Sequence, residues 1–73
     1  MEIDRTRAMW PQITAVIVQR IKDGTYPSGS KVPSVVQIAD EFGVVNSTAQ
    51  RAMEAVKAEG LTRAEKGMGT YVL

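Results

Sequence analysis

GVVNSTAQRAMEAVKAEG, residues 43–60, predicts a short turn that leads into one amphipathic helix. Small and apolar side chains recur at the i, i+3, i+4 and i+7 spacing of a helix that buries one face, and these are Ala49, Ala52, Met53 and Val56. The opposite face carries the polar side chains Asn46, Ser47, Gln50, Arg51 and Glu54. Amide and guanidinium groups near the N-terminal end of a helix suit the edges of bases in a DNA major groove.

The residues before this stretch predict a second helix joined to it by a tight turn. Ser34 and Gln37 have the spacing of a capping box, and Gly43 suits the left-handed residue that ends a helix. Helix, glycine turn and helix together are typical of a helix-turn-helix. Asn46 and Ser47 are both good caps, so we expect the later helix to start at one of them, and not to be capped at Val45.

The flanking segments complete the predicted architecture. Residues 61–65 and 70–73 alternate like strands around a glycine-containing tip, which indicates a hairpin, and residues 10–23 carry a further apolar stripe. We expect a very short strand around Lys31 and Val32 in the connector and a loosely packed lead-in over residues 1–7. The fold class is therefore mainly α with a small β-hairpin. One domain is expected over residues 1–73, with helices about 10–23, 34–42 and 46–59 and a two-stranded wing about 61–73.

Composition narrows the classes of function. The 73 residues include no cysteine and no histidine, so the commonest general base and zinc ligands are missing. We expect no enzyme activity, no metal and no cofactor. No apolar run approaches the roughly 20 residues of a membrane span, and residues 1–7 lack the layout of a secretory signal, so we expect a cytoplasmic protein that does not bind membranes. A net charge of only +1 does not by itself indicate nucleic-acid binding.

Specific residues give this chain a family resemblance over nearly its whole length. The pieces that carry it are Gln12-Ile13 with Ile17 and Ile21, residues 23–29 (DGTYPSG), 31–34 (KVPS), Ile38-Ala39, 42–44 (FGV), Thr48 with Ala52, 58–61 (AEGL) and 67–72 (GMGTYV). In this order they resemble the N-terminal winged helix-turn-helix domain of GntR-family bacterial transcription regulators. Each piece alone is common, and the ordered set is specific.

The resemblance implies a sequence-specific regulator of transcription that binds double-stranded DNA as a homodimer on a palindromic operator. Of repressor and activator we expect a repressor, associated with the bacterial nucleoid. The resemblance also implies that the last helix lies in the major groove and the wing lies near the minor groove. Family members usually carry a further effector-binding domain, and since this sequence stops at Leu73 we expect that domain to be absent from the chain.

Several positions depart from the family pattern. Arginines are common in the family at the positions of Val36, Asn46 and Gln50, and a hydroxyl cap is common at Val45. The predicted reading surface is therefore rich in amides, which favours adenine contacts over guanine contacts.

The candidate DNA contacts fall into three groups. On the last helix, Gln50, Asn46 and Arg51 suit bases or phosphates, while hydroxyls at two helix N-termini suit phosphate. On the wing, basic side chains flank two glycines that permit close approach to a backbone. The full set is Lys31, Ser34, Asn46, Ser47, Thr48, Gln50, Arg51, Arg63, Lys66, Gly67 and Gly69.

Other interpretations of these residues stay open. The hydroxyls and amides also suit plain helix capping, and Arg51 also suits a solvated ion pair with Glu54 or Glu41. The aromatic residues Trp10, Tyr26, Phe42 and Tyr71 are too dispersed to form a base-stacking platform, so we expect them in the core. The alternative function is a winged helix that binds another protein and has no specific DNA target.

Overall fold

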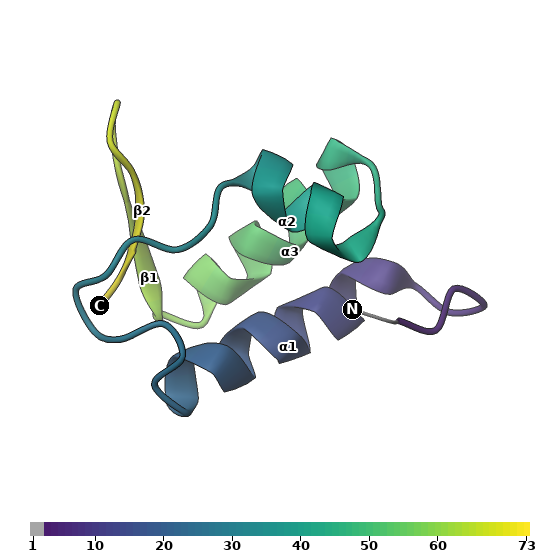
Figure 1. The fold of residues 1–73 in the computed structure, drawn as a ribbon, viewed down its shortest axis with the longest axis horizontal. Helices are drawn as coiled ribbons and strands as arrows, with labels where there is room; N and C mark the ends of the chain where they lie inside the picture. The colour runs from purple at the N-terminus through teal and green to yellow at the C-terminus, as the bar shows by residue number, and fades with distance from the viewer. Residues whose placement is uncertain (1–2) are drawn as a thin grey trace.

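The computed structural model describes residues 3–73 and shows three helices followed by a two-stranded antiparallel hairpin in that range (Figure 1). Helix α1 covers Met9–Lys22, α2 covers Val35–Phe42 and α3 covers Asn46–Ala58. Strand β1 covers Thr62–Glu65 and β2 covers Gly69–Val72. The expected fold class is confirmed. None of the helices in residues 3–73 is long and apolar enough to cross a lipid bilayer.

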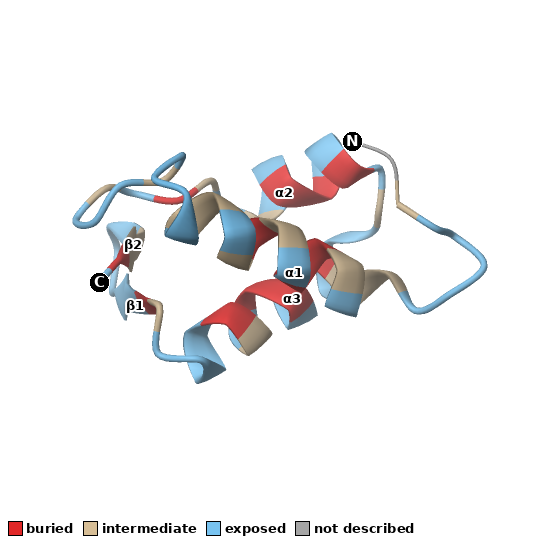
Figure 2. Cartoon of the chain, turned by 90° about the horizontal axis from the view of Figure 1, so that it is seen from below, coloured by how far each residue is buried: buried red, intermediate tan, exposed pale blue. Residues whose placement is uncertain are grey.

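The hydrophobic core lies between the three helices, with α3 packed against both α1 and α2 (Figure 2). The buried residues of α3 are the four predicted from spacing, because that spacing puts them on one stripe. Of the four aromatic residues expected in the core, only Phe42 is fully buried, and Trp10, Tyr26 and Tyr71 are half-buried. The remaining core comes from α1, α2, the connector and β2, through Ile13, Ile17, Val32, Ile38, Ala39 and Val72.

The turn between α2 and α3 is fixed from both sides. Gly43 takes the left-handed conformation (φ 65°, ψ 40°), and the Val44 N–H donates to the Ala39 carbonyl at 3.0 Å, which closes the end of α2. From the other side, the Arg5 guanidinium donates to the carbonyls of Phe42 (2.8 Å) and Gly43 (3.2 Å). The predicted loose lead-in is therefore wrong for Arg5, because its side chain satisfies carbonyls that the helix end leaves free. Met1 and Glu2 lie outside the described residues.

The first helical residue of α3 is Asn46, one of the two predicted starts, but its cap differs from the prediction. Val45 occupies the N-cap position, with an extended backbone (φ −72°, ψ 156°) and no side-chain capping bond. Its carbonyl still accepts from the N–H groups of Thr48 (3.1 Å) and Ala49 (3.3 Å), so the helix begins without a polar cap. Neither Asn46 nor Ser47 is the cap.

The wing is anchored to the helical body by the connector between α1 and α2. Strands β1 and β2 pair in the register Thr62↔Val72 to Glu65↔Gly69. Along the other edge of β2, Lys31 forms an isolated bridge with Tyr71, and the Val32 N–H donates to the Thr70 carbonyl at 2.9 Å. The short strand expected around Lys31 and Val32 is confirmed as this bridge. It fixes Lys31 beside the wing.

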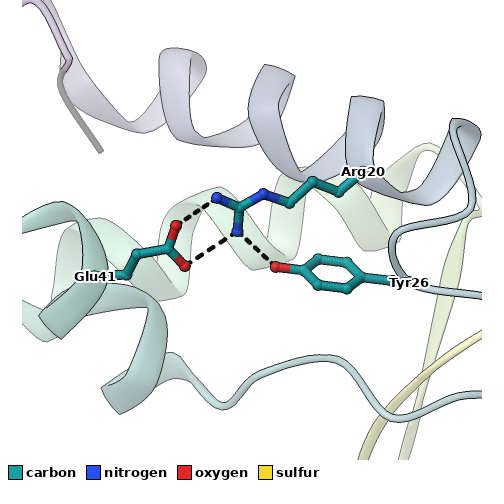
Figure 3. A network of polar contacts seen from close by, with 3 residues as sticks. All are labelled: Arg20, Tyr26 and Glu41. Atoms are coloured by element: carbon teal, nitrogen blue, oxygen red, sulfur yellow. Dashed lines mark hydrogen bonds and ion pairs between the residues drawn. The ribbon is translucent and has the colours of Figure 1, made fainter.

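A polar network joins α1, the connector and α2 (Figure 3). The Arg20 guanidinium forms a two-pronged ion pair with Glu41 and also donates to the Tyr26 hydroxyl at 2.6 Å. The hydrogen bonds from Arg20 hold the pKa of the Glu41 carboxyl below its ordinary value, and those to Glu41 raise the pKa of Arg20. The network holds α1 and α2 in one geometry. It also occupies the Glu41 carboxylate, which was one of the two alternative ion-pair partners of Arg51.

Candidate nucleic-acid interface

An open groove lies between the N-terminal end of α2, the face of α3 and the wing. Four of the predicted site residues line it: Lys31, Ser34, Gln50 and Gly69. They come from three segments of the chain, the connector, α3 and β2, and the fold brings them to one surface. The other lining residues are Val32, Pro33, Val35, Met53, Glu54, Lys57, Thr62, Ala64 and Thr70.

Lys31 lies across the wing because Gly69 leaves room for it. A Cβ atom built on Gly69 would lie 2.5 Å from the Lys31 Cε, and Gly69 has a φ of 121°, which side chains rarely adopt. The space at Gly69 is therefore filled by the stem of Lys31. No such contact exists at Gly67, where an added Cβ would meet nothing within 4 Å. The two wing glycines, predicted to act alike, differ in this way.

Ser34 brings the N-terminal end of α2 to the groove. Its hydroxyl accepts from the Gln37 N–H at 3.2 Å, and the Gln37 side-chain oxygen accepts from the Ser34 N–H at 2.8 Å. The predicted capping box is therefore present. Because the hydroxyl only accepts in this box, its proton remains available to a ligand in the groove. The α2 dipole adds positive potential at the same point.

One face of α3 forms the opposite wall of the groove. The Gln50 amide donates to the Glu54 carboxylate at 3.1 Å, so the alternative capping role of Gln50 is not observed and the side chain points along the helix. Lys57 lies further along the same wall. Sequence reasoning missed Lys57, although its position two turns after Gln50 places it on the same face. Lys31 and Lys57 together outweigh the single charge of Glu54 in this groove.

The first turn of α3 is presented to solvent. Asn46 and Ser47 are exposed and Thr48 is half-buried. Asn46 lines a second, shallow hollow with Val36, Ala39, Asp40, Gly43 and Val44, separate from the groove beside the wing. Because Asn46 is not the cap, capping of α3 does not occupy its side-chain amide.

Arg51 lies on the other side of α3, away from the groove. Its guanidinium stacks over the Trp10 ring of α1, 4.9 Å from the ring centroid. Its expected alternative partners are engaged elsewhere, since Glu54 accepts from Gln50 and Glu41 pairs with Arg20. Arg51 remains exposed to solvent, but its guanidinium lies against α1.

The wing places its basic residues at two different sites. Thr62 and Ala64 line the groove, so the alternation of a strand puts Arg63 on the opposite face of the hairpin. There it pairs with Glu65 and lies over the Tyr71 ring, 5.4 Å from the centroid. Lys66 and Gly67 are exposed at the tip between β1 and β2. The tip, and not Arg63, is therefore the free basic end of the wing.

Comparison with known proteins shows what this sequence is similar to. The family model described as "Bacterial regulatory proteins, gntR family" matches residues 11–72. The Exu regulon transcriptional regulator of Escherichia coli (strain K12) is 34% identical over 73 residues, which are 100% of this chain and 28% of that regulator. The Histidine utilization repressor of Pseudomonas putida is 31% identical over 64 residues, 88% of this chain and 26% of that repressor. The chain thus spans little more than a quarter of these two relatives.

Solved structures show the same fold. A GntR family transcriptional regulator from Listeria monocytogenes matches with a TM-score of 0.89 and 30% identity, over 96% of this chain and 61% of that one. The DNA-binding domain of AraR, in complex with operator ORE1, matches with a TM-score of 0.83 and 26% identity, over 88% of this chain and 78% of that one. A solved complex with DNA therefore exists for the same arrangement of three helices and wing.

Proposed function

The chain belongs to the GntR family of bacterial regulatory proteins, and from this premise we propose that it binds operator DNA sequence-specifically and regulates transcription. The relatives are transcription regulators, a class without enzyme activity. Of the two directions of regulation we propose repression, in the cytoplasm and on the nucleoid, and one relative is itself named a repressor. The observation that carries the proposal is the groove that unites Lys31, Ser34, Gln50 and Lys57.

The first turn of α3 enters the major groove of the DNA in this proposal. Asn46 and Gln50 have amide groups that suit the paired donor and acceptor of an adenine edge. Gln50 must release Glu54, to which it donates at 3.1 Å, before its amide reaches a base. Ser47 and Thr48, on the same turn, serve the adjacent phosphates through their hydroxyls.

One DNA backbone lies in the groove between α3 and the wing. Lys31 and Lys57 supply positive charge from opposite sides, and Ser34 supplies a hydroxyl proton and the N-terminal end of α2. The wing tip, with Lys66 and Gly67, lies near the minor groove. Arg63 has no part in this arrangement unless the hairpin changes, because it is paired on the far face.

Affinity requires two copies of the chain. With about three or four phosphate contacts per protomer, the slope of log K against log salt for a dimer is roughly −5 to −7, and one protomer supplies half of it. A homodimer on a palindromic site, with half-site centres about one helical turn apart, therefore fits a chain of net charge +1.

The test is a selection of bound duplexes from a random pool, followed by titration of the selected site. We expect a palindrome, and weaker binding by Gln50→Ala and Asn46→Ala at one base position each, by about 1–3 kcal/mol. For Arg51→Ala we expect weaker binding to the same site, because in the proposed complex the guanidinium leaves the Trp10 ring for the DNA. The proposal fails if no palindrome emerges, or if all three variants bind as tightly as the parent.

A salt titration separates this function from a protein-binding winged helix. We expect Lys31→Ala to reduce the salt slope by about 1 per protomer for every sequence. The matched control is Lys22→Ala, since Lys22 is exposed at the end of α1 and does not line the groove. A flat salt response of the parent toward duplex DNA would favour the protein-binding alternative instead.

A further inference from the structure

Two large apolar side chains are exposed at the end of the molecule where α3 begins. Val36 in α2 is 63% exposed, and Val45 at the N-cap of α3 is 66% exposed. A scattered exposed valine is ordinary in a soluble protein. These two are not scattered, because both border Asn46: Val45 precedes it in the chain, and Val36 lines the same shallow hollow.

The charge of this hollow argues against a phosphate as its occupant. Among its lining residues, Asp40 is the charged one, and its carboxylate repels phosphate oxygens. The cationic groups Lys31 and Lys57 line the other groove, beside the wing. The two surfaces, one at the first turn of α3 and the other further along it, therefore differ in chemistry: the groove suits a DNA backbone and the hollow suits an apolar partner.

The first turn of a recognition helix faces base edges in the major groove. Among those edges, the C5 methyl group of thymine is the apolar feature that distinguishes one base from the others. Valine has two methyl groups on a stiff branched stem, so a contact with such a methyl costs little side-chain entropy.

We propose that Val36 and Val45 contact thymine methyl groups in the major groove, beside an adenine read by Asn46. This inference rests on the proposed DNA binding and deepens it, because it assigns A·T pairs to the first turn of α3. Each methyl withdrawn from water in this way is expected to change affinity about fourfold.

The test removes only the methyl groups from the DNA. Each thymine of the selected operator is replaced in turn by deoxyuridine, which keeps every hydrogen-bonding group, and the Kd of the full chain is measured by fluorescence anisotropy. We expect about a fourfold loss at one or two positions in each half-site, and little change elsewhere. Val36→Ala and Val45→Ala are each expected to abolish the loss at one of these positions.

Two controls accompany the variants. Leu73→Ala removes an equally exposed apolar side chain, 58% exposed, from outside the hollow, and it should keep the full response to deoxyuridine. Thermal unfolding of each valine variant checks that it folds. The deoxyuridine series measured with the parent chain does not depend on any variant.

The possible outcomes separate failure of the thymine contacts from failure of the proposed DNA binding. If a specific site is bound but deoxyuridine weakens binding at no position, or the site contains no thymine near its half-site centres, the inference is overturned and DNA binding stands. It is also overturned if both valine variants retain the full loss. If no duplex is bound specifically, the proposed function itself fails.

Discussion

Val45→Thr is expected to stabilise the protein by giving α3 the side-chain cap that it lacks. Val45 already has the extended backbone of an N-cap residue, and no side-chain capping bond is present there. Threonine has the same branched shape as valine, so the exchange replaces one methyl by a hydroxyl that accepts from a free N–H of the first turn. Val45 is 66% exposed, so little apolar burial is lost.

A polar cap in place of an apolar residue contributes about 1 kcal/mol. For a domain of this size that raises the Tm by roughly 4–8 °C. The measurement is thermal and urea unfolding at pH 7, followed by circular dichroism. Val36→Thr is the matched control, since Val36 is 63% exposed in a helix already capped by Ser34, and its effect should stay within about 0.5 kcal/mol. An unchanged Tm for Val45→Thr, or an equal rise for Val36→Thr, would refute the reasoning.

Three further predictions concern single polar groups. The Thr62 hydroxyl is buried and without a partner in residues 3–73, so Thr62→Val should raise the free energy of unfolding by about 1 kcal/mol, whereas Thr14→Val, which loses a 2.8 Å bond to a backbone carbonyl, should lower it by about as much. Ser34→Ala removes the capping box and should cost about 1 kcal/mol, seen as a lower urea midpoint; no change would mean that the box contributes nothing. Glu41→Gln should cost roughly 1 kcal/mol at pH 7. Since Arg20 holds the folded pKa of Glu41 below its ordinary 4.5, the Tm difference should persist above that pH and close as the pH falls through the lowered pKa; a constant difference would contradict this.

The fold was predictable because local signals agree with one another. The apolar stripe of α3, the capping box at Ser34 and the glycine at position 43 each act within one turn of helix, where sequence spacing determines geometry. The resemblance to a family supplied the order of the elements. The cap of α3 was mispredicted because the Val45 backbone carbonyl accepts from the N–H groups of the first turn, where a side chain of Asn46 or Ser47 was expected to cap. Every residue has such a carbonyl, so the sequence does not reveal it.

The candidate site was less predictable because it depends on contacts between distant segments. The bridge between Lys31 and Tyr71 determines where that lysine lies, and no spacing rule relates positions 31 and 71. Arg51 looked like a base contact from its place on the helix, yet an aromatic ring some 40 positions earlier holds it. Lys57 is a different case, because its helical spacing from Gln50 was visible in the sequence and was overlooked.

The stacking of Arg51 on Trp10 also provides an optical reporter. Trp10 is the sole tryptophan in the chain, so the indole emission of the protein comes from the ring beneath that guanidinium. If Arg51 moves to DNA, the ring loses its cation and becomes more accessible to water, and the emission must shift. An unlabelled titration therefore follows one side chain's departure, and Arg51→Ala gives the spectrum of the uncovered ring before any DNA is added.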